Sequence, residues 1–314
     1  MEILKILGFI VVGLVILTYG ADVFVDGASK IAARFKISPI AIGLTIVAFG
    51  TSAPELAVNI ISVVNGTPDI ALGNVVGSNL CNIALILGLC ATIMPLTFSK
   101  QLIRLDLPLM NIAAIMLWFF GRDLSIQMYE SVIFTLLIVA YTFMQFRISK
   151  ANPQDVEVDM EVTGSASMDI VKFLIGLGML VGGAKLFVDG ATDGARLLGM
   201  SEAVIGLTIV AVGTSLPEIA TSVVATIRGQ RDIAIGNVVG SNIFNIFAVL
   251  GFSGLVARNG LPINEQIQSV DIPMMLGVSL LTAIFAFTAK KLNRPMGILF
   301  LLIYVGYTYY LIKK

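Results

Sequence analysis

The hexapeptide Gly-Thr-Ser-Ala-Pro-Glu at residues 50–55 recurs as Gly-Thr-Ser-Leu-Pro-Glu at residues 213–218. The repetition extends well beyond the hexapeptide: residues 37–88 align with 200–251 at a constant offset of 163, without a gap. Of these 52 aligned positions, 29 are identical. The chain therefore contains an internal duplication, and we expect two halves of similar structure.

The composition around these segments is that of a membrane protein. Of the 314 residues, 57% are hydrophobic and only 13% are charged, with a mean hydropathy of +0.95. A soluble domain carries about a quarter charged residues, so this chain has too little polar surface to cover a globule in water. The net charge of zero argues against a nucleic-acid partner, which would require a basic face.

Stretches of roughly 20 apolar residues predict transmembrane helices. Ten such spans are expected, at residues 3–26, 38–64, 69–94, 104–120, 126–147, 169–190, 201–227, 232–257, 270–289 and 295–312. Each half then has an odd number of spans, so the second copy enters the membrane upside down. Inverted repeats of this kind are a transporter architecture, with the binding site near the bilayer midplane.

The predicted fold is thus an all-α polytopic membrane protein in a cell membrane. Its domains are a first five-helix repeat at 1–148, a cytoplasmic linker at 149–168 and a second five-helix repeat at 169–314. With both termini outside, thirteen Lys and Arg residues lie on the cytoplasmic side and six on the outer side, as the positive-inside rule requires. The acidic residues between 155 and 161 indicate a solvated linker, with a regulatory role left open.

Both hexapeptides combine helix-breaking residues with oxygen ligands. Proline has no amide hydrogen and leaves a carbonyl oxygen without its helical donor. In a bilayer such broken helices occur only where they face protein, water or a bound ion. The hydroxyls and carboxylates of the two copies supply ligands for a hard cation. These candidate ligands are Thr51, Ser52, Glu55, Thr214, Ser215 and Glu218.

A second repeated motif adds further oxygens. Gly-Asn-Val-Val-Gly-Ser-Asn occurs at 73–79 and again at 236–242, followed by Asn82 and Asn245 respectively. Ser78 and Asn82 are four residues apart, as are Ser241 and Asn245, so each pair shares one helix face. The glycines at spacing four are also typical of close helix packing.

The two glutamates carry the energetic argument. An ionised side chain at the bilayer centre costs about 2.5–3.5 kcal/mol on insertion scales, and two facing carboxylates would also repel each other. A bound cation offsets both costs. The structural alternative is an ion pair, but Lys185 is the one basic residue expected inside a span, and it cannot neutralise two symmetric acids.

Calcium fits this ligand set best, because it takes six to eight oxygens in irregular geometry, whereas transition metals favour histidine or cysteine. There is no histidine, and there are two cysteines. The same oxygens can be divided among several sodium ions. A site of charge about −2 that accepts either calcium or sodium, but not both, is the physical basis of exchange.

These paired motifs resemble the two alpha repeats of the cation/calcium antiporter superfamily, most closely the prokaryotic sodium/calcium exchangers. The resemblance covers the whole ten-span plan. It implies that Glu55 and Glu218 are shared calcium and sodium ligands, and that the first and sixth helices slide across the others. It further implies hydroxyl ligands from the Thr and Ser residues named above, backbone carbonyl ligands from Ala48 and Ala211, and Asn82 and Asn245 at the centre.

The resemblance leaves the coupling ion open. Some relatives have an aspartate at one of the two central positions, where this chain has Asn82 and Asn245. This chain therefore lacks a possible third acid, and the resemblance does not give the number of sodium ions or decide whether protons contribute. Proton-coupled relatives tend to have glutamate where this chain has Ser78 and Ser241, which favours sodium. Calcium/proton exchange with the same glutamates is the alternative.

Two other classes of protein are alternatives to an antiporter: a cation channel, and an intramembrane enzyme with Ser52 or Ser215 as nucleophile. An enzyme of this kind would need a base such as histidine or lysine near the serine. The sequence has no histidine, so we expect no enzymatic activity. No cofactor is expected beyond the transported ions, the bilayer is the expected surrounding, and the oligomeric state stays open.

Overall fold

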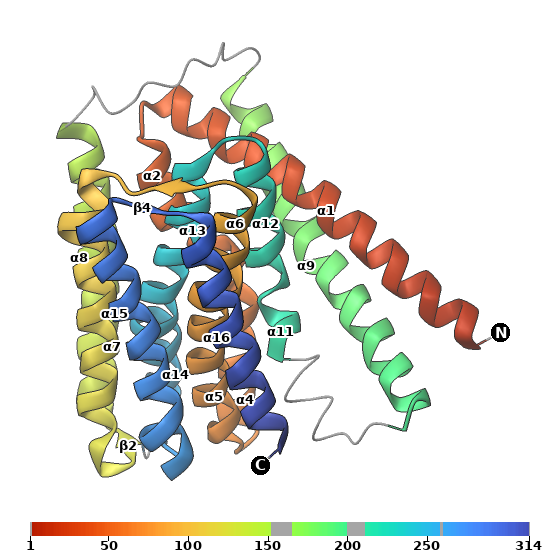
Figure 1. Ribbon diagram of the computed structural model, residues 1–314, viewed down its shortest axis with the longest axis vertical. Coiled ribbons are helices and arrows are strands. Elements are labelled where there is room, and N and C mark those ends of the chain that lie inside the picture. Colours follow the sequence, from red (N-terminus) through yellow and green to blue (C-terminus); the bar gives the residue numbers. More distant parts are fainter. Residues whose placement is uncertain (1, 152–164, 200–210, 258–259, 314) are drawn as a thin grey trace.

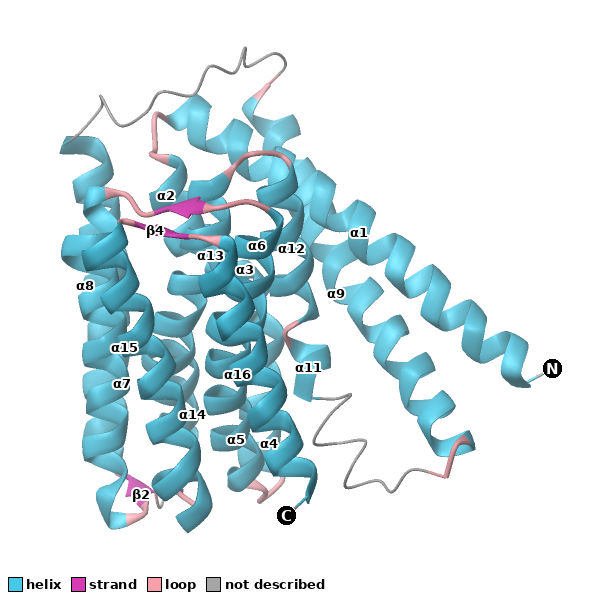
Figure 2. Cartoon of the chain, viewed as in Figure 1, coloured by secondary structure: helices cyan, strands magenta, loops and turns pink. Residues whose placement is uncertain are grey.

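The structure, a computed structural model, describes residues 2–151, 165–199, 211–257 and 260–313. These residues are almost entirely helical (Figures 1 and 2). The helices of the first half are α1 (Glu2–Phe35), α2 (Pro39–Ile42), η1 (Gly43–Val47), α3 (Ala48–Thr51), α4 (Ala53–Val64), α5 (Pro68–Leu80), η2 (Cys81–Leu87), α6 (Gly88–Ile93), η3 (Leu102–Asp106), α7 (Leu107–Phe120), η4 (Gly121–Asp123) and α8 (Met128–Ala151). Those of the second half are α9 (Ala166–Leu197), α11 (Ala211–Thr214), α12 (Leu216–Ile227), α13 (Arg231–Phe244), η7 (Asn245–Leu250), α14 (Gly251–Val256), η8 (Ile267–Asp271), α15 (Ile272–Ala289) and α16 (Arg294–Lys313).

Seven of the described helices are long and apolar enough to cross a membrane. An eighth span results if the bent pair Pro39–Thr51 and Ala53–Val64, with 42° between its members, counts as one. The predicted span at 201–227 begins in residues outside the described part of the chain. The polytopic helical character is therefore confirmed, whereas the number ten stays a prediction.

The helices α1 and α9 are longer than the expected spans at 3–26 and 169–190. α1 includes basic residues beyond its expected span, such as Lys30 and Arg34. The described helices thus contain basic residues besides Lys185, whereas the limits of the membrane-spanning parts stay a prediction. Lys185 pairs with Asp189 at 3.0 Å on an exposed part of α9, so it does not neutralise the glutamates.

Figure 1 shows α1 and α9 side by side and tilted away from the remaining helices. They run antiparallel and pack closely through glycines, because a Cβ atom on Gly13 would lie within 2.5 Å of the Phe187 amide nitrogen and one on Gly183 within 2.6 Å of the Leu17 amide nitrogen. Gly20 packs against Leu180 in the same way. The contacts Gly20–Leu180 and Leu17–Gly183 are exchanged by the offset of 163, so the pair has an internal pseudo-twofold axis.

The centre of the remaining body is formed by the duplicated segments. The helix from Arg231 to Val256 is buried throughout its apolar window, and that from Ile70 to Ile93 for 72% of it. A Cβ atom on Gly240 would lie 2.7 Å from the Leu44 carbonyl oxygen, and Gly236 packs as closely on Gly43. The packing role expected for spaced glycines is thus seen in the second copy, where it brings α13 against the broken helix of the first half.

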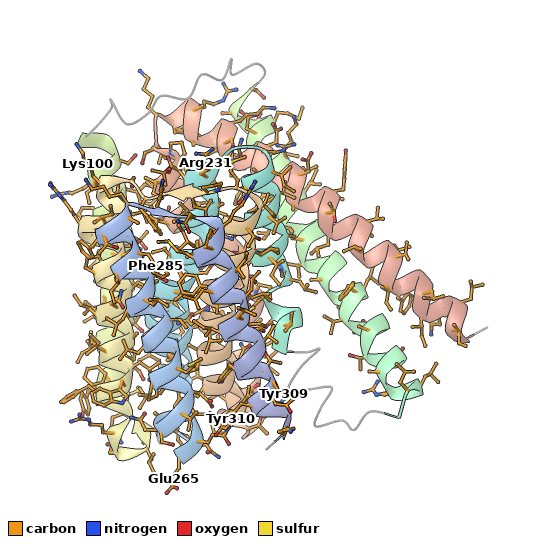
Figure 3. All side chains as sticks on the ribbon, viewed as in Figure 1. Lys100, Arg231, Glu265, Phe285, Tyr309 and Tyr310 are labelled. Atoms are coloured by element: carbon orange, nitrogen blue, oxygen red, sulfur yellow. The ribbon has the colours of Figure 1, made fainter. Side chains whose placement is uncertain are left out.

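Two short antiparallel strand pairs join the halves. The strand β1 (Leu96–Thr97) pairs with β4 (Lys291–Leu292), and β2 (Ser125–Ile126) pairs with β3 (Leu261–Pro262). Figure 2 shows β4 and β2 at opposite ends of the body. Figure 3 places Lys100 and Arg231 at the end where β4 lies, and Glu265 and Tyr310 at the other.

Candidate cation site

Both hexapeptides interrupt a helix at their serine. α3 ends at Thr51 and α4 begins at Ala53, with Ser52 between them at φ −86° and ψ 5°. α11 and α12 meet in the same way around Ser215, at φ −87° and ψ 4°. The proline in each new helix cannot donate to the carbonyl four residues earlier, on Gly50 or Gly213, so a backbone oxygen loses its usual donor at the break.

Each glutamate lies in the first turn of the helix that follows the break. Both side chains are buried, with 1% exposure. The helix N-terminus carries partial positive charge, which stabilises a carboxylate there. The fold therefore places one carboxylate from each half in the interior, oriented by equivalent helix ends.

The serines connect each glutamate to the opposite half. The Ser52 hydroxyl donates to Oε1 of Glu218 at 3.0 Å, and the Ser215 hydroxyl lies 3.5 Å from Oε1 of Glu55. The Ser215 hydroxyl also lies 3.2 Å from that of Ser78. The predicted residues Ser52, Glu55, Ser78, Ser215 and Glu218 thus come together at one place between the halves.

The threonines make a second exchanged pair of contacts. The Thr51 hydroxyl donates to Oδ1 of Asn237 at 3.0 Å, and that of Thr214 donates to Oδ1 of Asn74 at 3.2 Å. A hydroxyl that donates its hydrogen to an asparagine oxygen keeps lone pairs of the kind that coordinate a cation. Thr51 is fully buried.

The central asparagines are held by their amide nitrogens. Asn82 Nδ2 donates to Oδ1 of Asn242 at 3.1 Å, and Asn245 Nδ2 donates to Oδ1 of Asn79 at 2.9 Å. These bonds fix the side chains while leaving their own oxygens uncommitted. Ser241 is also fully buried, on the same helix as Asn245.

Several buried oxygens of these residues have no hydrogen-bond partner within the described part of the chain. They are Glu55 Oε2, Glu218 Oε2, Asn82 Oδ1, Asn245 Oδ1 and Ser241 Oγ. A buried polar group without a partner costs about 1–3 kcal/mol, and more if it is charged. Carboxylate, amide and hydroxyl oxygens are also the ligands that calcium and sodium prefer, so a hard cation would satisfy atoms that the protein leaves unpaired.

The two backbone carbonyls predicted as ligands belong to Ala48 and Ala211, next to the helix breaks. The Ala48 carbonyl already accepts a hydrogen bond from the Ser52 amide at 3.0 Å, and it lies 3.3 Å from the Thr51 hydroxyl as a second acceptor for the hydroxyl hydrogen. In the second half the Ser215 amide donates to the carbonyl of Val212, at 3.1 Å. Ala211 is the first residue of α11. The serine contacts differ between the halves, because the Ser215 hydroxyl lies 3.2 Å from that of Ser78 whereas the Ser241 hydroxyl has no hydrogen-bond partner in the described part of the chain.

The structure adds supporting residues that the sequence argument did not single out. Asn74 Nδ2 donates to Oδ1 of Asn59 at 2.8 Å, and Asn237 Nδ2 donates to the Ser222 hydroxyl at 2.9 Å. Asn59 and Ser222 are related by the offset of 163, but their identities differ. The repetition of Asn74 and Asn237 is the available signal in the sequence. Their partners Asn59 and Ser222, each in the same half, could not be deduced from it.

Comparison with known proteins places this arrangement in a family. The family model described as sodium/calcium exchanger protein matches residues 5–147 and 168–313. The chain belongs to the sodium/calcium exchanger family. The resemblance seen in the paired motifs is thereby confirmed.

Individual members of the family match along nearly their whole length. The putative antiporter CaxA of Alkalimonas amylolytica is 36% identical over 98% of both chains. The sodium/calcium exchanger MaX1 of Methanosarcina acetivorans is 34% identical over 95% of this chain and 96% of its own. Solved structures of the sodium–calcium exchanger NCX_Mj soaked with sodium and strontium include one with a TM-score of 0.84 and 35% identity, covering 97% of this chain and 98% of that one.

Membership of the sodium/calcium exchanger family has direct consequences. The chain is a cation/calcium antiporter and a multi-pass protein of the cell membrane, as its sequence indicated. Its relatives are transporters rather than enzymes.

Proposed function

We propose that this antiporter exchanges calcium for sodium across the cell membrane by alternating access, with one central cation site shared by both halves. The proposed ligands are the carboxylates of Glu55 and Glu218 and the oxygens around them. Those oxygens belong to Thr51, Ser52, Ser78, Asn82, Thr214, Ser215, Ser241 and Asn245, with backbone carbonyls of Ala48 and Ala211. Thr51 and Thr214 join the glutamates as direct metal ligands.

The unpaired buried oxygens are the observation that supports this proposal most. Oε2 of both glutamates and Oδ1 of Asn82 and Asn245 have no donor in the described structure, and they come equally from the two halves. The two buried carboxylates accept hydrogen bonds from serine hydroxyls in the described structure, and if ionised they need about two positive charges. One calcium ion or two sodium ions supply that charge, so the two cargoes compete for the same oxygens and exchange follows.

The membrane arrangement is part of the proposal. Residues 1–148 and 169–314 are two inverted five-helix repeats joined by a cytoplasmic linker at 149–168, with both termini outside. The antiparallel pseudo-twofold packing of α1 and α9 supports the inversion. The position of Lys100 and Arg231 at one common end supports assignment of that end to the cytoplasm (Figure 3).

The test is calcium uptake into proteoliposomes that contain the purified protein. An outward sodium gradient should drive calcium accumulation, and collapse of that gradient with a sodium ionophore should stop it. An imposed pH step without sodium should produce no uptake.

The outcomes separate the alternatives. Uptake that follows the pH step and ignores sodium would replace the proposal with calcium/proton exchange. Calcium flux that needs no counter-ion on the opposite side would indicate a channel.

A further inference from the structure

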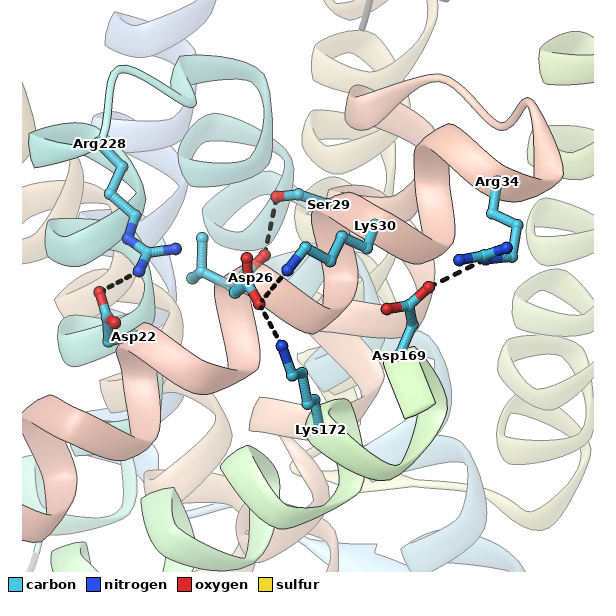
Figure 4. Close-up of polar contacts among 9 residues, drawn as sticks. Asp22, Asp26, Ser29, Lys30, Arg34, Asp169, Lys172 and Arg228 are labelled. Atoms are coloured by element: carbon cyan, nitrogen blue, oxygen red, sulfur yellow. Dashed lines mark hydrogen bonds and ion pairs between the residues drawn. The ribbon is translucent and has the colours of Figure 1, made fainter. Parts of the chain in front are cut away.

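Three ion pairs between helices surround the end of α1 that leads into the body, and Figure 4 shows them together with the Lys30–Asp26 pair within α1. Two lie within the α1–α9 pair: Arg34 with Asp169 at 2.9 Å, and Lys172 with Asp26 at 3.4 Å. The third joins the pair to the body, because Asp22 of α1 contacts Arg228 at 2.5 Å.

Arg228 occupies a defined position at the end of α12. It is the C-cap residue of that helix, with φ −75° and ψ 0°, and its amide donates to the Val224 carbonyl at 2.9 Å. The equivalent residue in the first half is Asn65, the C-cap of α4, with φ −80° and ψ 1° and an amide bond of 2.9 Å to Ile61. The two caps have the same backbone geometry but different side chains.

The residue opposite Arg228 also has an equivalent of different charge. The offset of 163 relates Asp22 on α1 to Lys185 on α9. The mirror image of the Asp22–Arg228 pair is thus Lys185 with Asn65, which is not an ion pair. In the structure Lys185 is 75% exposed and pairs with Asp189.

The two long helices α1 and α9 also pack differently on the remaining helices. α1 packs along α12, whereas the equivalent contact of α9 with α4 is slight or missing over these described helices. The structure therefore shows one of two arrangements that the inverted repeat relates, and the other would place α9 along α4.

We propose that the Asp22–Arg228 ion pair is a latch that stabilises the arrangement with α1 against α12, and that the opposite access state has no equivalent. Asp22 and Arg228 are positioning residues, since they act on the distribution between access states and contact no proposed ligand. This inference rests on the proposed alternating access, but not on which ion is the counter-ion.

The size of the effect follows from the exposure of the pair. The side chains of Asp22 and Arg228 are 46% and 31% exposed. Partly exposed pairs of this kind change an equilibrium by about two- to fivefold. Removal of the latch should therefore move the populations measurably without unfolding the protein.

The experiment measures the two arrangements directly. Spin labels on Ile61 of α4 and Val181 of α9, both exposed, report the separation of these helices in reconstituted protein. Asp22→Asn and Arg228→Gln should each raise the short-distance population relative to the long one by about two- to fivefold. The double swap Asp22→Arg with Arg228→Asp should restore the original ratio.

A constructed mirror latch provides the matched control. Asn65→Asp places a carboxylate where Lys185 can reach it in the opposite state, so it should shift the populations in the same direction as Asp22→Asn. In a Lys185→Gln background the same substitution should have no effect.

The latch proposal is overturned if the single neutralisations leave the distance populations unchanged, or if the charge swap fails to restore them. These distances are measured without transport. A failure of the latch with intact sodium-driven calcium uptake is therefore distinguishable from a failure of the proposed exchange.

Discussion

Each glutamate at the centre is positioned by a hydroxyl from the opposite half, Glu218 by Ser52 and Glu55 by Ser215. Neither half could hold its own carboxylate in this way. The site is therefore a property of the interface between the halves, and a change in one half alters the carboxylate of the other.

Loss of one carboxylate should abolish exchange. Glu55→Gln or Glu218→Gln keeps the shape of the side chain but removes one of the two negative charges that a cation requires. Because even supporting residues around a metal account for about ten- to hundredfold in affinity, calcium affinity should fall by about a hundredfold or more. Sodium-driven calcium uptake measures this, with the exposed Glu265→Gln as the control. Near-normal uptake by either variant would remove the residue from the site.

The asparagines behind the threonines should matter less than the ligands. Asn237→Ala removes the acceptor that orients the Thr51 hydroxyl, and Asn74→Ala does the same for Thr214. Calcium affinity should fall by about ten- to hundredfold in each variant with the maximal rate less affected. The exposed Asn65→Ala should leave the concentration dependence of uptake unchanged. An unaltered affinity in both variants would show that the threonine orientation is unimportant.

Most residues of the candidate site can be identified from the sequence, whereas their hydrogen-bond partners cannot. The two glutamates, the hydroxyls and the central asparagines are recognisable because residues with oxygens of the kind that bind hard cations are repeated at a fixed offset within apolar stretches. The contacts of Asn74 with Asn59 and of Asn237 with Ser222 could not be deduced, since they depend on how neighbouring helices cross. The hydrogen bond that the Ala48 carbonyl accepts from the Ser52 amide could not be deduced either, since it depends on the backbone geometry between α3 and α4.

At the scale of elements, α1 and α9 combine tight mutual packing with a loose attachment to the body. Glycines at Gly13, Gly20 and Gly183 let the two backbones approach each other, and two ion pairs join them at one end. Such a pair should move as one unit, because separating it would break both the packing and the ion pairs.

A methyl group inserted between α1 and α9 should therefore be harmful. Gly183→Ala brings a Cβ atom within 2.6 Å of the Leu17 backbone, whereas Gly182→Ala meets nothing within 4 Å. Overpacking of this kind typically costs about 1–3 kcal/mol, so Gly183→Ala should lower both the melting temperature in detergent and the rate of exchange. Gly182→Ala should resemble the unmodified protein, and equal behaviour of the two variants would contradict the packing assignment.

The elements also show which sequence predictions fail and why. The apolar stretches gave the positions of the central helices closely, such as 69–94 against Pro68–Ile93. α1 extends beyond the expected 26, because Lys30 and Arg34 near its end are paired and do not terminate the helix. α9 extends beyond the expected 190 with Arg196 paired to Asp193. Hydropathy alone cannot distinguish a paired charge from a solvated one.

At the scale of the whole molecule, the two halves share one buried acidic centre, and its charge should oppose the folded state unless a cation is bound. Calcium at 100 times its dissociation constant should therefore stabilise the protein by about 2.7 kcal/mol. Thermal unfolding in detergent with increasing calcium measures this. The double variant Glu55→Gln with Glu218→Gln should lose the increase, and a persistent increase would assign the effect to another site.

The strand pairs at opposite ends of the body limit how this transporter can work. β1 with β4 and β2 with β3 each connect one half to the other, with hydrogen bonds such as Phe98 to Lys290 at 3.0 Å and Ile263 to Leu124 at 2.8 Å. A rotation of one half against the other that separates them at one end would break the hydrogen bonds of the strand pair there. The two halves are thus joined at both ends of the body, and we expect opening toward either compartment to depend on the two long helices α1 and α9.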